Sequence, residues 1–143
     1  MEISEIIKPG MTVEKRFQVE DQHSASQAGS GGVPVLATPW MIAFMENAAF
    51  NLLEDVLPEG SSSVGVLVEV RHLAATPIGA AVRVQVEITE VEGKRVSFSL
   101  QAWDEHEEIG TGQHQRVIID QNRFLRRVNE KSTLKIKQNR NLN

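Results

Sequence analysis

The apolar positions change their period along the chain, from helical in residues 38–57 to alternating in residues 64–119. Thr38 stands where a helix N-cap is expected, and Pro39 follows at the first helical position. The apolar residues that come next cover every side of the predicted helix. Because a helix that is hydrophobic all round is buried on all sides, we expect a central helix that ends at the segment 57–60.

Strands are predicted on both sides of this helix. One segment, residues 11–19, precedes it, and four follow it: 64–72, 81–89, 96–102 and 108–119. In segment 64–72, four alternating valines share one face with His72. Regular alternation with short turns is typical of an antiparallel sheet with one covered face. The order of elements predicts an α+β fold, in which a five-stranded antiparallel sheet wraps around a long central helix.

Glycines mark the connections in this scheme. Glu92-Gly93 predicts a two-residue turn, because glycine supplies the positive φ that such turns require. Gly110 and Gly112 indicate a bulge or a close backbone approach in the last strand. Residues 20–34 are polar and glycine-rich, which predicts a mobile loop.

Length and composition narrow the class of protein. The 143 residues correspond to one domain, and we expect it to span residues 1–130, followed by a basic, flexible tail over residues 131–143. The absence of cysteine excludes disulfides, thiolate metal sites and a cysteine nucleophile. An acidic N-terminus without a signal-peptide pattern, and no apolar run of ~18 residues, predict a cytoplasmic protein without a membrane partner.

Charge is divided unevenly along the chain. Residues 1–120 hold 18 acidic and 8 basic residues, a net charge of −10, whereas residues 121–143 hold 7 basic residues and one acid, a net charge of +6. The acidic body would repel nucleic acid, and no zinc finger or aromatic stacking motif supports nucleic-acid binding. The basic end predicts a solvated terminal helix with a frayed end, whose cations can also touch phosphate.

Glu46 is the only charged residue between Thr38 and Leu53. Burial of an unpaired carboxylate is costly, so Glu46 is expected to be paired, hydrogen-bonded or protonated. Two interpretations stay open from the pattern alone. Glu46 is either held by a structural hydrogen bond or a subunit contact, or it is a catalytic carboxylate, because isolated ionisable groups in apolar settings often mark active sites.

Other polar residues have a structural and a functional interpretation. His72 is either a satisfied core histidine or a catalytic group. Thr38 is either a helix cap or a hydroxyl at a helix N-terminus, where negative charge is favoured. His114 and Arg116 alone predict an exposed pair on a sheet surface. His23 and His106 are expected in loops, and the four scattered histidines do not predict a metal site.

Three segments of the chain resemble the hotdog-fold thioesterases, most closely the fluoroacetyl-CoA thioesterase family. These segments are ATPWMIAFMENAAF, VEVRHLAATPIG and VEGKRVSFSLQAWDEHEEIGTGQHQRVII, and the resemblance covers roughly residues 8–130. It implies the hotdog fold and hydrolysis of a small acyl-CoA thioester. The family's catalytic threonine, glutamate and histidine match Thr38, Glu46 and His72.

The resemblance also implies how the site works. Glu46 is expected to act as base or nucleophile with His72 as its proton partner, while Thr38 positions the carbonyl or the attacking group. Substrate-binding roles are expected for Gly79, His114 and Arg116. Neither a metal nor an organic cofactor is expected, since coenzyme A is part of the substrate.

One departure from the family changes the expected substrate. The family closes its pocket with phenylalanines just before the threonine, but residues 27–37, QAGSGGVPVLA, contain no aromatic residue. We therefore expect a different acyl preference and a more open pocket mouth.

Spacing on the helix predicts the assembly. Thr38 and Glu46 lie about 12 Å apart along a straight helix, so they cannot both touch one carbonyl. Either the chain bends at Thr38 or the site is shared between subunits. Hotdog proteins generally dimerise by joining their sheets edge to edge, and a homodimer is therefore expected.

Two other functions remain to be weighed. A hotdog enoyl-CoA hydratase would pair an aspartate with a histidine, and that signature is not apparent in the sequence. A non-catalytic acyl-CoA-binding protein would keep the pocket without turnover, and the intact residues Thr38, Glu46 and His72 weigh against it.

Overall fold

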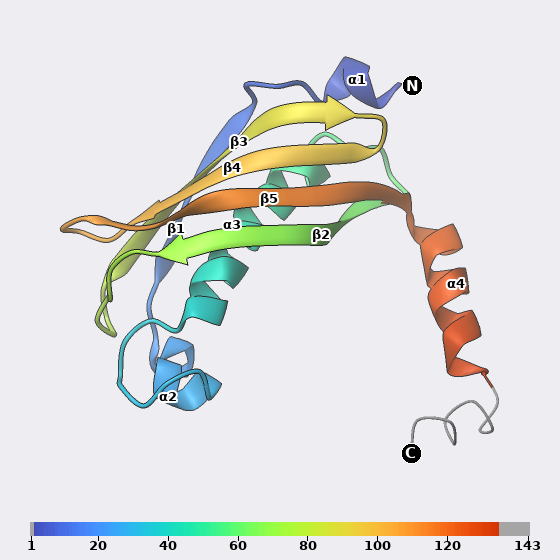
Figure 1. Ribbon diagram of the computed structural model, residues 1–143. Coiled ribbons are helices and arrows are strands. Elements are labelled where there is room, and N and C mark those ends of the chain that lie inside the picture. The colour runs from blue at the N-terminus through green and yellow to red at the C-terminus, as the bar shows by residue number, and fades with distance from the viewer. Residues whose placement is uncertain (1, 135–143) are drawn as a thin grey trace.

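A five-stranded antiparallel sheet curves around one long helix, α3 (Thr38–Glu54), as the α+β prediction requires (Figure 1). The computed structural model describes residues 2–134. The strands are β1 (Thr12–Gln18), β2 (Ser61–His72), β3 (Ala81–Glu92), β4 (Arg95–Trp103) and β5 (Glu108–Asp120). Their order in the sheet is β1-β3-β4-β5-β2, which leaves β1 and β2 as the two edges.

The helix α3 is buried on one side only, in contrast to the prediction that it is buried all round. The residues facing the sheet are buried: Met41, Phe44, Met45, Ala48, Ala49, Leu52 and Leu53. On the other side Ile42, Glu46 and Phe50, at four-residue intervals, are half-buried. One sheet covers only one face of a helix, so no other part of residues 2–134 covers this apolar second face. The helix also begins one residue earlier than predicted, with Ala37 as the N-cap and Thr38 as the first helical residue.

Glycines in β5 allow two close approaches, as predicted from the sequence. A Cβ atom at Gly110 would lie 2.6 Å from the sulfur of Met41, so the missing side chain lets α3 pack directly on the strand. A Cβ atom at Gly112 would clash with the backbone of β2 at Glu69 and Val70. Close backbone approach is a common reason for glycine inside a strand.

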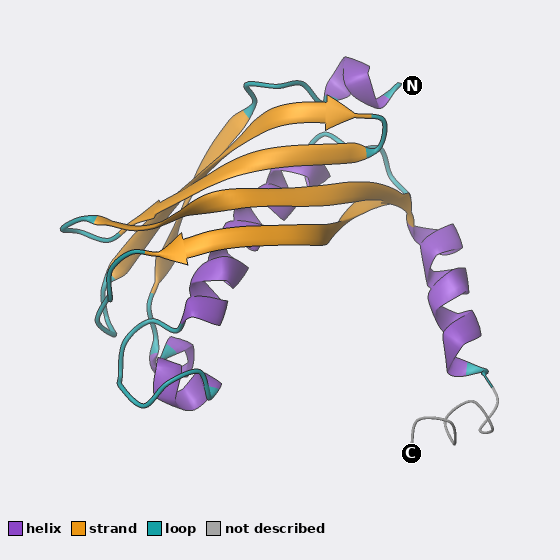
Figure 2. Ribbon diagram, in the orientation of Figure 1, coloured by secondary structure: helices purple, strands orange, loops and turns teal. Residues whose placement is uncertain are grey.

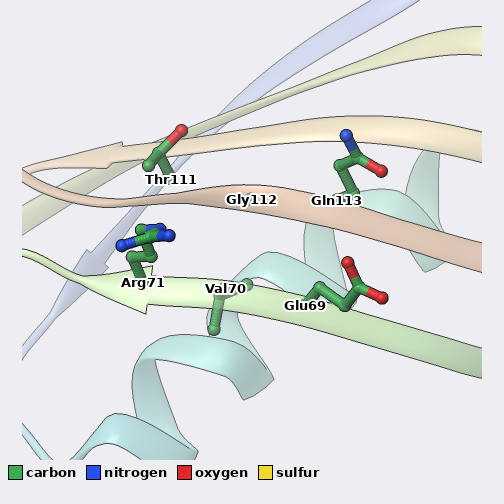
Figure 3. Close-up of a pocket in the computed structure, with 6 residues that line it drawn as sticks. All are labelled: Glu69, Val70, Arg71, Thr111, Gly112 and Gln113. Atoms are coloured by element: carbon green, nitrogen blue, oxygen red, sulfur yellow. The ribbon is translucent and has the colours of Figure 1, made fainter.

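A β-bulge changes which residues of β2 face the helix. The register with β5 shifts between Gly65 and Leu67. Val68 and His72 then lie opposite His114 and Gly110, residues of β5 that are buried against α3. Before the bulge, Val64 lies on the other face, so the expectation that four valines and His72 share one face is wrong. Figure 3 shows the alternation after the bulge: Val70 points toward α3, while the neighbouring charged side chains of β2 point away from it, over a polar hollow on the outer face.

Residues 20–34 are more structured than the predicted mobile loop. They contain a 3₁₀ turn, η1 (Asp21–His23), and a short helix, α2 (Ala25–Ala28). His23 is 7% exposed, and its ring lies edge-on to Trp40 and Phe44, with centroids 4.5 and 5.0 Å away. Aromatic packing of this kind stabilises the segment against the first turns of α3.

Smaller differences occur at the ends of the chain and at one turn. A short helix, α1 (Ile3–Ile6), precedes β1. The β3–β4 turn is Gly93-Lys94, one residue later than predicted, with Gly93 at φ +61° and Glu92 already paired with Arg95.

The C-terminal helix α4 (Gln121–Ser132) projects away from the sheet at the end of β5 (Figure 2). The tail predicted for residues 131–143 begins within this helix, and residues 135–143 lie outside the described residues. Within residues 2–134, no helix has the length and apolar character needed to cross a bilayer.

Candidate active site

A threonine and a histidine meet where α3 begins and β2 ends. The Oγ1 atom of Thr38 lies 2.7 Å from Nδ1 of His72, within hydrogen-bond distance. Burial lowers the pKa of His72 from 6.5, and this outweighs a backbone hydrogen bond at Ala74 that raises it. At neutral pH the imidazole is therefore mainly neutral and can take the proton of the threonine hydroxyl.

The other ring nitrogen of His72 is unusual. Nε2 is buried and has no hydrogen-bond partner among the described residues. Buried polar atoms without partners are rare in folded proteins and call for an explanation such as a ligand or a catalytic role.

A hollow of about 430 Å³ lies beside the Thr38–His72 pair. Its lining residues are small or aliphatic apart from that pair and one serine: Ala25, Ser30, Gly31, Val33, Val35, Leu36, Thr38, His72, Leu73, Ala74 and Ala75. None of them is aromatic, as expected from residues 27–37. Such a lining suits a small apolar group and offers it few hydrogen bonds.

Hydrogen bonds from a distant hairpin hold one wall of this hollow. The fully buried Thr76 donates its hydroxyl to Asp104 over 3.0 Å, and its carbonyl accepts the N–H of Leu36 over 2.8 Å. Burial raises the pKa of Asp104. Hydrogen bonds from two backbone N–H groups and from Thr76 lower this pKa by more than burial raises it, so the net shift is downward. The ionised Asp104 thus anchors the segment that follows His72.

A second polar cluster surrounds Glu46 in the middle of α3. Arg116 on β5 donates from Nε to Oγ of Ser63 at 2.8 Å and from Nη2 to the Ser63 carbonyl at 3.0 Å. Its Nη1 atom lies 3.9 Å from Oε2 of Glu46 and 3.2 Å from Nε2 of His114. Two bonds to one serine fix the guanidinium plane, which directs the remaining nitrogen at the carboxylate.

The partners of His114 determine its tautomer. Nδ1 lies 2.8 Å from the Leu67 carbonyl, which can only accept, so Nδ1 carries the proton. Nε2 is then the acceptor for Arg116. Burial lowers the pKa of His114, with a smaller lowering from the charge of Arg116, against raising effects of the Leu67 hydrogen bond and Glu46. A neutral His114 therefore presents Arg116 to Glu46.

Gly65 on β2 leaves the room that the Glu46 carboxylate occupies. A Cβ atom at this position would lie 3.0 Å from Oε2 of Glu46 and 3.2 Å from Cε1 of His114. The position was not among the residues predicted for the site. A single glycine inside a run of valines was the available indication, because such a glycine often marks a close approach. For Ser63 the sequence contains no comparable indication.

The structure corrects three expectations about these residues. The partner of Glu46 is Arg116, and that of His72 is Thr38, so the expected Glu46–His72 contact is absent within the described chain. The Glu46 side chain is also 41% exposed, not buried. His114 and Arg116, expected on a sheet surface, are 0% and 6% exposed, because even-numbered β5 residues face α3.

Gly79 lies apart from both clusters. It adopts φ +95° in the β2–β3 connection, and its N–H donates to the carbonyl of Val19 over 2.7 Å. Its position explains the glycine by turn geometry. In residues 2–134, no three histidine or acidic side chains are grouped as metal ligands would be.

Comparisons with known proteins identify the family of the chain. The family model described as fluoroacetyl-CoA-specific thioesterase matches residues 19–122. The fluoroacetyl-CoA thioesterase of Streptantibioticus cattleyicolor is 39% identical over 98 residues, which cover 68% of this chain and 70% of that protein. The residues that the family model matches include the Thr38–His72 pair and Glu46.

Solved structures extend the likeness to the whole fold. A variant of the fluoroacetyl-CoA-specific thioesterase in complex with fluoroacetate and CoA superposes with a TM-score of 0.78 at 31% identity, covering 82% of this chain and 99% of that chain. A hot-dog-like protein from Thermanaerovibrio acidaminovorans superposes with a TM-score of 0.86 at 29% identity, covering 94% and 100%. The chain therefore belongs to the fluoroacetyl-CoA thioesterase family and is an acyl-CoA thioesterase with the hotdog fold.

Proposed function

We propose that the protein is a homodimer that hydrolyses short-chain acyl-CoA thioesters at sites shared between subunits. Thr38 and His72 come from one subunit and Glu46 from the other, and neither a metal nor a further cofactor takes part. The observation that carries this proposal is the separation of the two clusters. Thr38 and Glu46 are eight residues apart on the regular helix α3, about 12 Å along its axis.

Pairing of β2 with a second copy of itself would join the clusters. β2 is an edge strand of 12 residues, and its free edge can accept another strand. Gly65 marks the position of the Glu46 carboxylate, and His72 lies seven residues further on. Because the bulge takes one of the residues between them out of the register, a two-fold axis midway between them, at Glu69, sets Gly65 opposite the partner's His72.

The surfaces around this edge favour the same arrangement. Val66 and Val68 on β2 are 48% and 36% exposed. The uncovered side of α3, with Ile42 and Phe50 beside Glu46, is also apolar and half-buried. A long apolar edge strand is prone to pair with other chains unless it is covered, and a second copy covers both surfaces at once.

The chemistry follows from the contacts of each group. Thr38 Oγ1 attacks the thioester carbonyl carbon while its proton passes to Nδ1 of His72. The C–S bond breaks, and the imidazolium returns the proton to the CoA thiolate. Glu46 of the partner subunit then accepts a proton from water as the water oxygen attacks the carbonyl carbon of the threonine ester. The bond from that carbon to Thr38 Oγ1 breaks, the proton passes from Glu46 to Oγ1, and the acid is released. Developing negative charge on the carbonyl oxygen is favoured at the N-terminus of α3, where Thr38 stands.

The lining of the hollow beside Thr38 selects the acyl group of the substrate. The aliphatic side chains of Val33, Val35 and Leu36 suit a short unsubstituted acyl group. An aromatic side chain that would interact with fluorine or close the mouth is absent from the described lining residues. We therefore propose that fluoroacetyl-CoA is not the preferred substrate of this enzyme.

Complementation between inactive variants tests the shared site. Glu46→Gln and His72→Ala homodimers are each expected to lose thiol release from acetyl-CoA. When both are unfolded together and refolded, half of the dimers are mixed and each has one complete site. The mixture should regain about one quarter of the wild-type specific activity.

The matched control mixes two variants whose substitutions both affect the part of the site that one subunit contributes. Thr38→Ala and His72→Ala break the same pair within each chain, so their mixture should regain nothing. No recovery in the Glu46→Gln mixture would refute the shared site. A wild-type protein that releases no thiol from any acyl-CoA would refute the thioesterase assignment of this site.

A further inference from the structure

Helix α4 is an amphipathic helix that, among residues 2–134, has no packing partner along most of its length. Leu125 and Val128 are 53% and 46% exposed, and Phe124 is half-buried. With about 100° between successive residues, these three side chains form one apolar stripe. Arg127 and Lys131 border that stripe and line a hollow on the helix together with Phe124, Val128, Glu130 and Leu134. Arg126 is not among the residues that line this hollow.

Nothing among the described residues explains these features. In Figure 1, α4 leaves the end of β5 and runs away from the sheet. The match to the family model ends at residue 122, so most of α4 lies beyond the residues that this model matches. Exposed apolar stripes of this kind mark interaction sites more often than solvated surface.

The hollow beside Thr38 and His72 lacks the basic side chains that α4 carries. Among its lining residues none is lysine or arginine, although CoA carries several negative charges on its phosphates. Its mouth exposes two apolar side chains, Val33 at 56% and Leu73 at 49%. The part of the chain before residue 121 is acidic, with a net charge of −10, and would not attract an anionic ligand by itself.

Strand direction places α4 next to this mouth in the dimer. Ser61 pairs with Asp120, the residue before α4, and Gln121 donates its N–H to Gly60. α4 therefore starts at the Ser61 end of β2, and the Thr38–His72 hollow lies at the opposite end, roughly 36 Å away within one chain. In a two-fold antiparallel pairing of β2, the Ser61 end of one strand lies beside the His72 end of the other.

We propose that α4 docks on the partner subunit at the mouth of its Thr38–His72 hollow, where Arg127 and Lys131 bind the phosphates of CoA. The apolar stripe covers Val33 and Leu73 of the partner subunit. Charge supports this choice of occupant, because the basic α4 meets the acidic body of a second copy. Guanidinium and ammonium groups are the side chains that bind phosphate best. This inference rests on the proposed dimer and thioesterase activity.

Cross-linking tests where α4 lies. The chain has no cysteine, so a Leu73→Cys, Leu125→Cys double variant carries the only two thiols. A short bis-maleimide cannot join them within one chain, because they belong to opposite ends of β2. We expect a cross-linked dimer on a denaturing gel. A Leu125→Cys, Arg16→Cys pair, with Arg16 on the opposite edge strand β1, should give only monomer.

Kinetics test what α4 binds. Arg127→Gln and Lys131→Gln should each raise KM for acetyl-CoA about ten-fold, with kcat little changed, because a charge-assisted phosphate contact is lost. Acetyl-pantetheine lacks the nucleotide phosphates, and its kcat/KM should be the same in these variants and the wild type. Arg126→Gln removes the same charge from a residue that does not line the hollow on α4, and kcat/KM for both substrates should be unchanged.

The outcomes separate this inference from the activity on which it rests. Absence of the cross-link, or equal effects of Arg126→Gln and Arg127→Gln, would overturn the inference while acetyl-CoA is still hydrolysed. Binding of the protein to phosphatidylserine vesicles through α4, without the cross-link, would also overturn it and identify a lipid surface as the occupant. A wild type that hydrolyses neither thioester contradicts the proposed function itself.

Discussion

The two polar clusters differ in how they are held, although both contact α3. The Thr38–His72 pair is a single 2.7 Å hydrogen bond at the mouth of an aliphatic hollow, and it involves no charged group. Around Glu46, a buried arginine is fixed by Ser63 and His114, and the carboxylate itself remains 41% exposed. The first cluster pairs a hydroxyl with an imidazole whose lowered pKa keeps it able to accept a proton. The second holds a partly exposed carboxylate beside a buried guanidinium.

This difference teaches that neither cluster is a complete hydrolytic site. A nucleophile with a neutral base lacks the group that activates water, and a carboxylate with its arginine lacks an acyl pocket. The following changes test how far the two clusters depend on each other, beginning with those of largest effect.

Removal of one group from each cluster should have the largest effect. Glu46→Gln and His72→Ala should each lower kcat by about 10²–10⁴-fold, the range for a positioned acid or base. The double variant should lose little more than either single variant if the two groups act in one site. The measurement is kcat for acetyl-CoA, with the melting temperature taken on the same sample.

A second acid on the same helix provides the control. Glu54 lies eight residues beyond Glu46 on α3 and accepts a hydrogen bond from Ser62 at 2.8 Å. Glu54→Gln should leave kcat unchanged. A folded Glu46→Gln protein with normal kcat would show that the second cluster is only structural.

Displacement of the carboxylate should have an intermediate effect. In Gly65→Ala the new methyl group lies 3.0 Å from Oε2 of Glu46, so the carboxylate must move by a few tenths of an ångström. Because catalytic groups act only over short distances, we expect kcat to fall about ten-fold with little change in stability. Gly65→Val should lower kcat further. Equal activity of all three proteins would contradict the placement of Glu46 beside β2.

Acidification should affect the neutral pair first. Burial lowers the pKa of His72 from 6.5, so the unfolded chain binds the proton more readily than the folded one. The stability that neutral His72 contributes to the folded protein is fully present above pH 6.5. It is lost as the pH falls through the lowered pKa that His72 has in the folded state. The acid limb of kcat/KM should accordingly lie below pH 6.5, since protonated His72 cannot accept the Thr38 proton.

Denaturant unfolding at pH 7.5 and 5.5 measures the stability effect. His114 has a lowered pKa for the same dominant reason, burial, and contributes in the same direction. The loss of stability on acidification should therefore be smaller in His72→Gln than in the wild type, but not zero. An acid limb of activity above pH 6.5 would argue against a buried neutral His72 as the base.

Discrimination between acetyl and fluoroacetyl groups should show the smallest effect. With no aromatic side chain among the described lining residues, the ratio of kcat/KM for fluoroacetyl-CoA to acetyl-CoA should be far below about 10³, or 4 kcal/mol. Val33→Phe adds an aromatic ring at the mouth and should raise this ratio. A wild-type ratio above 10³ would mean that the hollow beside Thr38 does not set the acyl preference.

Local sequence patterns determined the elements of this protein and many of its chemical groups. The alternating segments and the all-apolar helix predicted a sheet around α3, because side-chain burial follows the period of each element. The isolated Glu46 and the motif around His72 each indicated one residue of a polar cluster, although the two residues were expected to contact each other. The glycines of β5 also indicated a close approach that the contacts with Met41 and β2 confirm.

Only the tertiary structure decided which groups meet. A single bulge after Gly65 reversed the face of the later β2 residues, and no local period reveals such a shift. The burial of His114 and Arg116 depends on the pairing of β5 with β2, which brings Ser63 to the guanidinium from 53 residues away. The exposed side of Glu46 likewise reflects which face of α3 the sheet leaves uncovered. Contacts between distant segments depend on register and curvature, and these arise from the assembled sheet, not from any single segment.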